Sequence, residues 1–487
     1  MLCSLKTDYQ DRLVFYQLSI ISAYLILTQN NIYLITTGLL LCSFLSFYLL
    51  YVENFDKKYY ATFRLQILAS SCITCGLFML IKDFSINNNA NLDISNCWTI
   101  FATGLTFVGI IIRTDLLPFA QYYTSVSDSL STTFLSQGVI LPISLVLLLK
   151  LSIYYVRYEY YSTILLYVSI IGLIVSSIKS LFNNNIYKAT NFHTLGIINL
   201  TVFLQSIHLY NSAKYILLYY FLFKTCLLIL TENICSIMSK ETDIATMGGL
   251  KNYTKITFTL YLFTSISSII VLLSRNVYAP LYEVFAGSHK TFVICIYTLF
   301  CAAHSIGFAR LIYSIFLGNN RSNDFVFARI KEVPFVRLIP IIISVIGMFL
   351  YICLFKITRF SYLDSNLRIF QLIHYIICGS VFFASCFMQK LLIKHNVKIT
   401  NTFFKKMFNV KINEHVIRLA RNVYCFLHNM LASKKIVTLP RNIEHFYRKL
   451  EILRLDVASL YQQFLMLTIV IFGVIFILLF ITLHKTQ

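Results

Sequence analysis

Residues 217–228 read LLYYFLFKTCLL, an apolar and aromatic run that a single lysine, Lys224, interrupts. Roughly ten or more mostly apolar residues flank it on either side, and a helix of about 20 such residues crosses a bilayer. A charge at that depth costs a few kcal/mol even on the most lenient insertion scale, so it is a candidate functional group. The run therefore predicts a spanning helix in which Lys224 either handles a proton or ion, or pairs with an acid such as Glu232 two turns away.

The whole chain has the composition of a polytopic membrane protein. Of its 487 residues 58% are hydrophobic and 13% are charged, and the mean hydropathy is +0.73. A water-soluble fold could not bury that much apolar surface. In hydrocarbon each backbone polar group must be paired inside the protein, which a helix does by itself. We therefore predict an all-α fold of about thirteen transmembrane helices. They are expected near residues 13–30, 32–52, 60–82, 99–121, 132–156, 159–182, 191–210, 212–238, 253–274, 291–316, 335–357, 367–393 and 464–484.

A long basic segment separates the twelfth and thirteenth predicted spans, so we expect three parts. Residues 1–393 form a bundle of twelve spans, residues 394–463 a basic amphipathic segment, and residues 464–487 a C-terminal anchor helix. Between Lys390 and Asp456 fourteen Lys or Arg residues stand against four acids. An apolar stripe at helical spacing predicts an interfacial helix that lies along the membrane, and a solvated loop is the alternative. The stripe consists of Phe408, Ile412, Leu419, Val423, Phe426 and Met430.

The formal net charge of +21 points to a membrane surface and not to nucleic acid. Much of this charge lies in the basic segment, which alternating loops place on the same side as Lys57, Lys188 and Lys331. Positive loops stay on the cytoplasmic side, or on the matrix side of a mitochondrion. We therefore predict a multi-pass protein of a bacterial cell inner membrane or a mitochondrial inner membrane, with the basic segment on that side. Anionic lipids are the expected electrostatic partners, and no nucleic acid is expected.

Two charged residues close the fourth predicted span. Arg113 and Asp115 lie in GIIIRTDLLPF, residues 109–119. Both are candidates for a proton or ion path, because charges inside spans are retained for a purpose. The alternative is an arginine that snorkels to the membrane interface with Asp115 as its partner.

Three further ionisable residues lie in the second half of the chain. Glu283 follows SRNVYAP, residues 274–280, which either interrupts a spanning helix, as polar groups and Pro do at ion sites, or forms an ordinary loop. His304 and Arg310 lie in the tenth predicted span. A histidine on such a face belongs either to a proton relay or to the hydrogen-bonded core.

No sequence pattern indicates a cofactor, a metal or a catalytic site. Cys72 and Cys75 are the one close cysteine pair, and they lie inside a span without a second pair, which is typical of core packing. Nothing resembles a haem, flavin, iron–sulfur or nucleotide site. The first two predicted spans run together without the cleavage site of a signal peptide, so we expect a hairpin that stays in the membrane.

Several stretches share their order and spacing with one known family. RTDLLPF, residues 113–119, resembles the family run GKSAQxP[LF]H. YFLFKTCL, residues 220–227, resembles HAFFKALL, and the spacing from its lysine to MGGL, residues 247–250, is kept without a gap. FARLIYSIFLG, residues 308–318, is similar to the family's FRLxFxxFxG segment. Together they resemble the antiporter-like membrane-arm subunits of respiratory complex I, in particular subunit L, which is chain 5 of the mitochondrial enzyme.

This resemblance covers nearly all of the chain and implies its architecture. FYQL, residues 15–18, through QNN, residues 29–31, looks like the family's fourth helix. The basic segment looks like the lateral helix by which subunit L lies along its neighbours. The predicted spans would then be the family's fourth to sixteenth helices, with the first three absent. The resemblance implies broken helices in the bundle, other membrane-arm subunits as partners, and no quinone or NADH chemistry in this chain.

The chain departs from the family at the positions that carry protons. The family's essential glutamate of the fifth helix falls on Leu40, and the lysine of its broken twelfth helix falls on Leu281. Arg113 replaces a lysine, and an arginine does not release a proton near neutral pH. The histidine of the broken eighth helix is missing from residues 136–138, so Lys224 alone is unchanged.

These features predict a membrane-arm subunit of an NADH:quinone oxidoreductase-like complex in which the substituted carboxylate and lysine impair proton translocation. One alternative is a subunit of a cation/proton antiporter or ion-driven uptake complex, although such relatives usually lack the lateral helix. A second alternative is a non-conducting structural paralogue, which the substitution at Leu40 favours. The candidates for the proton or ion path are Lys224, Arg113, Asp115, Glu232, Glu283, His304 and Arg310.

Overall fold

The computed structural model describes residues 17–26, 28, 32–53, 57–86, 97–114, 116, 141–152, 159–239, 241–286, 291–321, 330–357, 376, 379–382 and 384–385. These residues form helices and no strand, with one isolated bridge between Asn185 and Asp243. The longer helices are α2 (Ile32–Glu53), α3 (Lys57–Ile86), α4 (Cys97–Arg113), α7 (Leu141–Lys150), α9 (Glu159–Phe182), α10 (Ile186–Ser206), α11 (Tyr210–Ile237), α12 (Lys255–Leu272), α13 (Arg275–Ala286), α14 (Thr291–Ile312) and α16 (Phe335–Ile357). Three short turns accompany them: η2 (Ile244–Thr246), η3 (Leu250–Asn252) and the π-helical η4 (Tyr313–Leu317).

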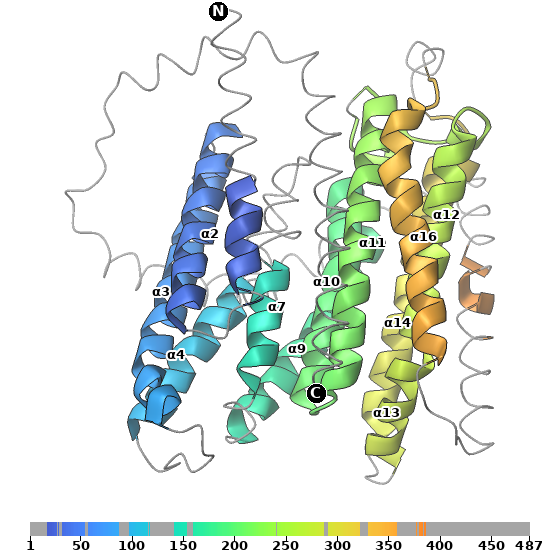
Figure 1. Ribbon diagram of the computed structural model, residues 1–487. Coiled ribbons are helices and arrows are strands. Elements are labelled where there is room, and N and C mark those ends of the chain that lie inside the picture. Colours follow the sequence, from blue (N-terminus) through green and yellow to red (C-terminus); the bar gives the residue numbers. More distant parts are fainter. Residues whose placement is uncertain are drawn as a thin grey trace, which may run out of the picture.

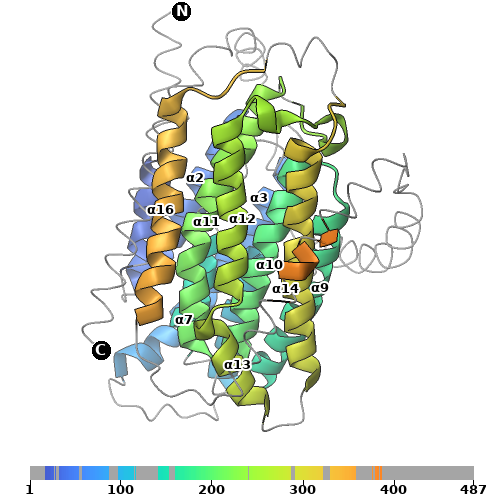
Figure 2. The ribbon, with the colours of Figure 1, turned by 90° about the vertical axis from the view of Figure 1, so that its right-hand side faces the viewer.

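The helices stand side by side in an elongated bundle (Figure 1). At one end α2 packs on α3 and α3 packs on α4, while α7 contacts both α4 and α11. At the other end α10 and α11 pack together and are joined by α9, α12, α14 and α16. Figure 2 shows α11, α12, α14 and α16 running in nearly the same direction, with α13 below α12. The bundle therefore has a first group, α2–α4, and a second group, α9–α16, bridged by α7.

The all-α membrane fold predicted from the sequence is confirmed. Five helices of the described part are long and apolar enough to cross a membrane, and five shorter apolar helices accompany them. Each of the first eleven predicted spans contains a helix of the structure. The twelfth span lies mostly outside the described residues, and the basic segment and the anchor helix lie entirely outside them. The count of thirteen spans and the three-part division of the chain therefore stay predictions.

The predicted interruption near residues 274–280 takes the form of a helix break and not of an open loop. Helix α12 ends at Leu272, and α13 begins at Arg275 and continues through Pro280. The phenol of Tyr297 on α14 donates to the carbonyl of Leu272, so the backbone freed by the break keeps a partner in the apolar interior.

Helix α10 is the most enclosed element of the second group. Every residue of α10 except Lys188 is buried, although the helix carries Asn191, His193, Thr194 and Asn199. Its neighbours α9, α11 and α14 exclude lipid from all of its faces. Hydrogen-bond partners for polar side chains in that position come from the protein, because hydrocarbon offers none.

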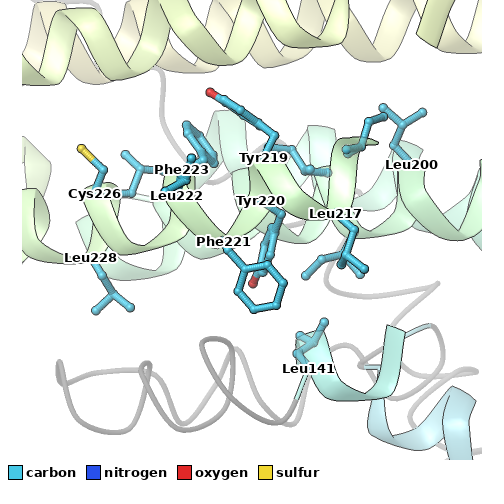
Figure 3. Close-up of a cluster of buried hydrophobic side chains, with 14 of the residues drawn as sticks. Leu141, Leu200, Leu217, Tyr219, Tyr220, Phe221, Leu222, Phe223, Cys226 and Leu228 are labelled. Atoms are coloured by element: carbon cyan, nitrogen blue, oxygen red, sulfur yellow. The ribbon is translucent and has the colours of Figure 1, made fainter. Parts of the chain in front are cut away.

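Large apolar and aromatic side chains fill much of the core around α11. Figure 3 shows Tyr219 and Phe223 extending from one face of this helix and Tyr220 and Phe221 from the opposite face, toward Leu141 of α7. Lys224 is therefore surrounded along its own helix by large apolar side chains, and its partners must come from another helix.

The N-terminus of α12 is capped by a distant carboxylate. Glu332 accepts from the backbone N–H groups of Ile256 (3.0 Å) and Thr257 (3.4 Å) and from the Thr257 hydroxyl (2.5 Å). A carboxylate at a helix N-terminus accepts hydrogen bonds from otherwise unpaired amides. Its negative charge also interacts favourably with the positive end of the helix dipole. We expect Glu332→Ala to weaken the first turn of α12 by about 1 kcal/mol, so that its amides exchange with solvent roughly fivefold faster.

Hydrogen exchange of residues 255–259 measures this effect. Lys331→Ala is the matched control, because Lys331 is exposed beside Glu332. Equal exchange in both variants would show that the carboxylate is not a working cap.

Candidate functional site

Lys224 lies at the centre of α11 and is only 3% exposed. Its ammonium donates to Asn191 Oδ1 at 2.8 Å and to Thr194 Oγ1 at 3.2 Å, both on α10. Asn191 and Thr194 are three residues apart, so they lie on the helix face that meets α11. Both acceptors are neutral, so the positive charge of Lys224 is stabilised by the dipoles of an amide and a hydroxyl group.

Glu232 lies two turns further along α11, and its carboxylate has a partner of its own. The hydroxyl of Tyr187 on α10 donates to Glu232 Oε2 at 2.5 Å. Helix α10 thus presents two acceptors to the lysine and one donor to the acid. Lys224 donates to Asn191 and Thr194 of α10, and Glu232 accepts from Tyr187 of α10, so α10 supplies a partner to each of them.

Two buried histidines meet beside this site. His193 on α10 and His304 on α14 are 1% and 2% exposed, and their Nδ1 atoms are 3.4 Å apart. The Nε2 atom of His304 lies 3.3 Å from the Ser268 hydroxyl on α12. The histidine pair therefore links three helices through the interior of the second group.

His193 was missed by the sequence analysis, and so were Asn191 and Thr194. A signal was present, because the predicted span 191–210 begins with several polar side chains that no lipid-facing helix would carry. His193 lies between the two acceptors of the lysine along α10. The sequence did not reveal which helix this polar stretch would face.

Arg310 belongs to one end of the bundle and not to its centre. Its guanidinium donates to the Leu181 carbonyl and, at 2.9 Å, to Asn184 Oδ1, at the C-terminal end of α9. Asp243 adds an opposite charge nearby. The contacts of Arg310 are those of a residue that joins helix ends.

The MGGL turn is held by a second arginine at the same end. Arg321 donates through Nε to the Met247 carbonyl at 2.8 Å and through Nη2 to the carbonyls of Ser314 (2.6 Å) and Ile244 (3.4 Å). Burial lowers the pKa of the Arg321 guanidinium from its ordinary value, and the neighbouring Asp243 carboxylate opposes that shift. One guanidinium thus ties the turn to the end of α14.

Arg113 is buried in the first group of helices and is 1% exposed. Its Nη1 atom donates to Ser70 Oγ of α3 at 2.8 Å and lies 3.4 Å from Ser43 Oγ of α2. Among the described residues, its Nε and Nη2 atoms have no hydrogen-bond partner. Such burial does not fit an arginine that snorkels to the interface, and Asp115 lies outside the described residues.

The sequence profile of one family matches more than half of the chain. The family is described as "NADH:quinone oxidoreductase/Mrp antiporter, TM", and the match runs over residues 30–318, which include Lys224, Arg113 and both buried histidines. The chain belongs to this family. Its apolar helices make it a membrane protein of the complex I and Mrp antiporter-like kind.

Relatives of known name are similar over part of their length. NADH-ubiquinone oxidoreductase chain 5 of Talaromyces marneffei is 23% identical over 336 residues, covering 65% of this chain and 46% of the relative. Chain 5 of Aspergillus niger is 24% identical over 309 residues, covering 60% and 44%. The chain thus spans less than half the length of the curated relatives that it matches. A chain of the Mrp complex from a Dietzia species has a similar fold, with TM-score 0.54 and 12% identity, over 63% of this chain and 60% of that one.

Leu40 and Leu281, at which the resemblance leads us to expect the family's glutamate and lysine, lie in different surroundings. Leu40 is 53% exposed on α2, so its side chain points away from the interior that holds Arg113. Leu281 on α13 is buried, whereas Glu283 is exposed. The structure therefore brings Lys224 and His304 into one half of the bundle, but Arg113 and Glu283 do not contact them.

Proposed function

We propose that the chain is a membrane-arm subunit of an NADH:quinone oxidoreductase-like complex and that its ion path is reduced to the half around Lys224. The observation that carries this proposal is the buried ammonium of Lys224, held at the centre of α11 by two neutral groups of α10. Nothing in a folding role requires a lysine there, because burying a charge costs several kcal/mol. Retention of that charge supports a role in moving protons or ions.

The first half of the bundle supports impaired translocation. Its buried cation is Arg113, whose hydrogen-bond partners are the hydroxyls of Ser70 and Ser43. An arginine side chain is a poor proton donor compared with lysine, and a serine hydroxyl does not ionise near neutral pH. Among the described residues, the groups next to Arg113 are these hydroxyls and the buried thiol of Cys42, which exchange protons poorly near neutral pH, and this supports impaired passage through the half around Arg113.

Purification of the native complex tests the assembly. We expect a tag on this chain, in membranes of its own source organism, to recover the subunits of an NADH dehydrogenase. We expect these subunits to be recovered together because the antiporter-like subunits of such a complex pack side by side in its membrane arm. Recovery of the chain alone, or with an unrelated assembly, would contradict the proposal.

A cation/proton antiporter or an ion-driven uptake complex is the second candidate. The similar fold of the Mrp complex chain favours it. The same purification distinguishes the two, because an antiporter would be recovered with other antiporter subunits and without NADH dehydrogenase activity. A non-conducting structural subunit would be recovered with either partner set and would show no effect of substitutions at Lys224.

The setting of the chain follows from its charge. We propose an energy-transducing membrane, the bacterial cell inner membrane or the mitochondrial inner membrane, with the basic segment of residues 394–463 on the cytoplasmic or matrix side. That segment would lie on partner subunits or on anionic lipid headgroups. Its high positive charge supports this arrangement.

A further inference from the structure

The hydrogen bonds between α11 and α10 at Lys224 have a fixed direction. Lys224, Asn191 and Thr194 are 3%, 2% and 0% exposed, so the contact lies in the interior of the bundle. The ammonium donates to Asn191 Oδ1 at 2.8 Å and to Thr194 Oγ1 at 3.2 Å. Since an ammonium has no acceptor, the amide atom that faces it must be the oxygen, and the hydroxyl must present a lone pair. The hydroxyl proton of Thr194 is donated to the backbone carbonyl of Asn191 at 2.9 Å.

Two acceptors suit both protonation states of the lysine. An ammonium has three N–H groups, and loss of one proton to a water molecule leaves a neutral amine with two N–H groups and one lone pair. Asn191 and Thr194 can accept from these two N–H groups, so both hydrogen bonds persist while the third N–H bond breaks and re-forms. The proton leaves and returns as hydronium, no electron moves, and the charge is conserved.

The neutrality of the two acceptors matters as much as their number. When Lys224 is neutral, these three side chains carry no charge. A carboxylate in place of Asn191 would pair with the ammonium, and loss of the proton would leave that carboxylate buried and unpaired. Because an unpaired buried charge is costly, such a pair would hold the proton. Two neutral acceptors therefore permit a proton exchange that a carboxylate would oppose.

We propose that Asn191 and Thr194 are the positioning residues of the Lys224 site, which hold the side-chain nitrogen in one place while it loses and regains a proton. This inference rests on the proposed function and extends the site from α11 to α10. A lysine has a flexible four-carbon stem, so its nitrogen takes a single position only where its partners fix it. Asn191 and Thr194 lie on one face of α10, which α9, α11 and α14 enclose.

Thr194 offers a matched pair of variants, measured as translocation by the purified native complex in vesicles at equal amounts of assembled complex. Thr194→Val keeps the shape of the side chain but removes the acceptor, so we expect translocation to fall several-fold. Thr194→Ser keeps the hydroxyl, so we expect it to retain most of the translocation that the valine variant loses. A packing role predicts the reverse order, because valine fills the site and serine leaves a small cavity.

Thr190→Val is the control for the valine substitution. Thr190 lies on the same helix and is 3% exposed. Its hydroxyl donates to the carbonyls of Ile186 at 2.9 Å and Tyr187 at 3.0 Å, within α10 itself. We expect translocation by this variant to equal that of the native complex. A loss as large as that in Thr194→Val would assign the effect to the helix and overturn the inference.

Asn191→Asp tests the neutrality of the site. Aspartate has nearly the same size and accepts from the ammonium at the same place, but it carries a negative charge that favours the protonated lysine. We expect translocation to fall roughly tenfold or more, although the hydrogen bond becomes stronger. A residue needed only for packing or for a hydrogen bond would give near-normal translocation in this variant. The Thr194 variants change no charge, so they decide the question even if Asn191→Asp lowers the amount of complex.

Lys224→Met separates the failure of this inference from that of the proposed function. Normal translocation in Thr194→Val and Asn191→Asp, in a complex where Lys224→Met abolishes it, would overturn the positioning role and leave the proposed function standing. Normal translocation in assembled Lys224→Met complex would overturn both.

Discussion

Lys224→Met is expected to abolish the ion translocation that depends on this chain while leaving the complex assembled. Methionine has a similar length and fills the same space between α10 and α11, but it carries no proton. Lys224 is 3% exposed, and its ammonium donates to Asn191 and Thr194, which methionine cannot do. Translocation by the native complex in vesicles, compared at equal amounts of complex, measures the effect.

Stability is expected to be retained in this variant. Taking an ammonium out of water costs several kcal/mol, and two hydrogen bonds from a charged donor return about 1.5–3 kcal/mol each. Removing the charge therefore removes a cost as well as two bonds. A thermal unfolding midpoint that stays near or above that of the native complex would agree with this balance. Failure to assemble would show that Lys224 serves the fold.

Lys224→Arg separates the charge from the proton. An arginine keeps a positive charge at the site but does not release its proton, so we expect translocation to be lost in this variant too. Lys255→Met is the control, because Lys255 is exposed at the start of α12. Normal translocation in Lys224→Arg would mean that the site needs a fixed charge, which is also what Arg113 supplies to the first half of the bundle.

The sequence predicted the class of fold because the bilayer imposes it. Long apolar runs must become helices in hydrocarbon, and the predicted span at 212–238 coincides closely with α11. The span at 191–210 was placed several residues late, because α10 begins at Ile186. Its polar first turns gave no apolar signal, since they face other helices and not lipid.

The candidate site could be predicted only in part for the same reason. Lys224 is conspicuous in sequence because it breaks an apolar run, and its burial is confirmed. Its partners come from another helix. The spacing of residues along one sequence does not show which helices pack together, so these contacts could not be predicted. His304 was singled out, but its partner His193 lies 111 residues earlier and was not. The roles proposed for these residues remain predictions.

Gly248→Ala is expected to disrupt the turn that follows α11 and to lower the amount of folded chain in the membrane. Gly248 has a φ of 155°, which residues with a side chain rarely adopt, and a Cβ atom there would overlap the carbonyl oxygen of Asn319. The segment around Asn319 would have to move, and Arg321 would lose its short contacts with the carbonyls of Met247 and Ser314. The combined strain and lost bonds amount to roughly 3 kcal/mol or more.

Gly249→Ala is the matched control for this prediction. Gly249 has a φ of 70°, in the left-handed region, where alanine costs only about 1 kcal/mol. The strain from this φ is smaller than that expected at Gly248, so the thermal midpoint should fall less than in Gly248→Ala. Arg321→Lys should resemble Gly248→Ala, because a lysine keeps the charge but cannot reach several carbonyls with one planar group. Equal stability of the two glycine variants would contradict this prediction. It would mean that the Arg321 contacts with the carbonyls of Met247 and Ser314 do not stabilise the fold, and that only the backbone conformation of the two glycines matters.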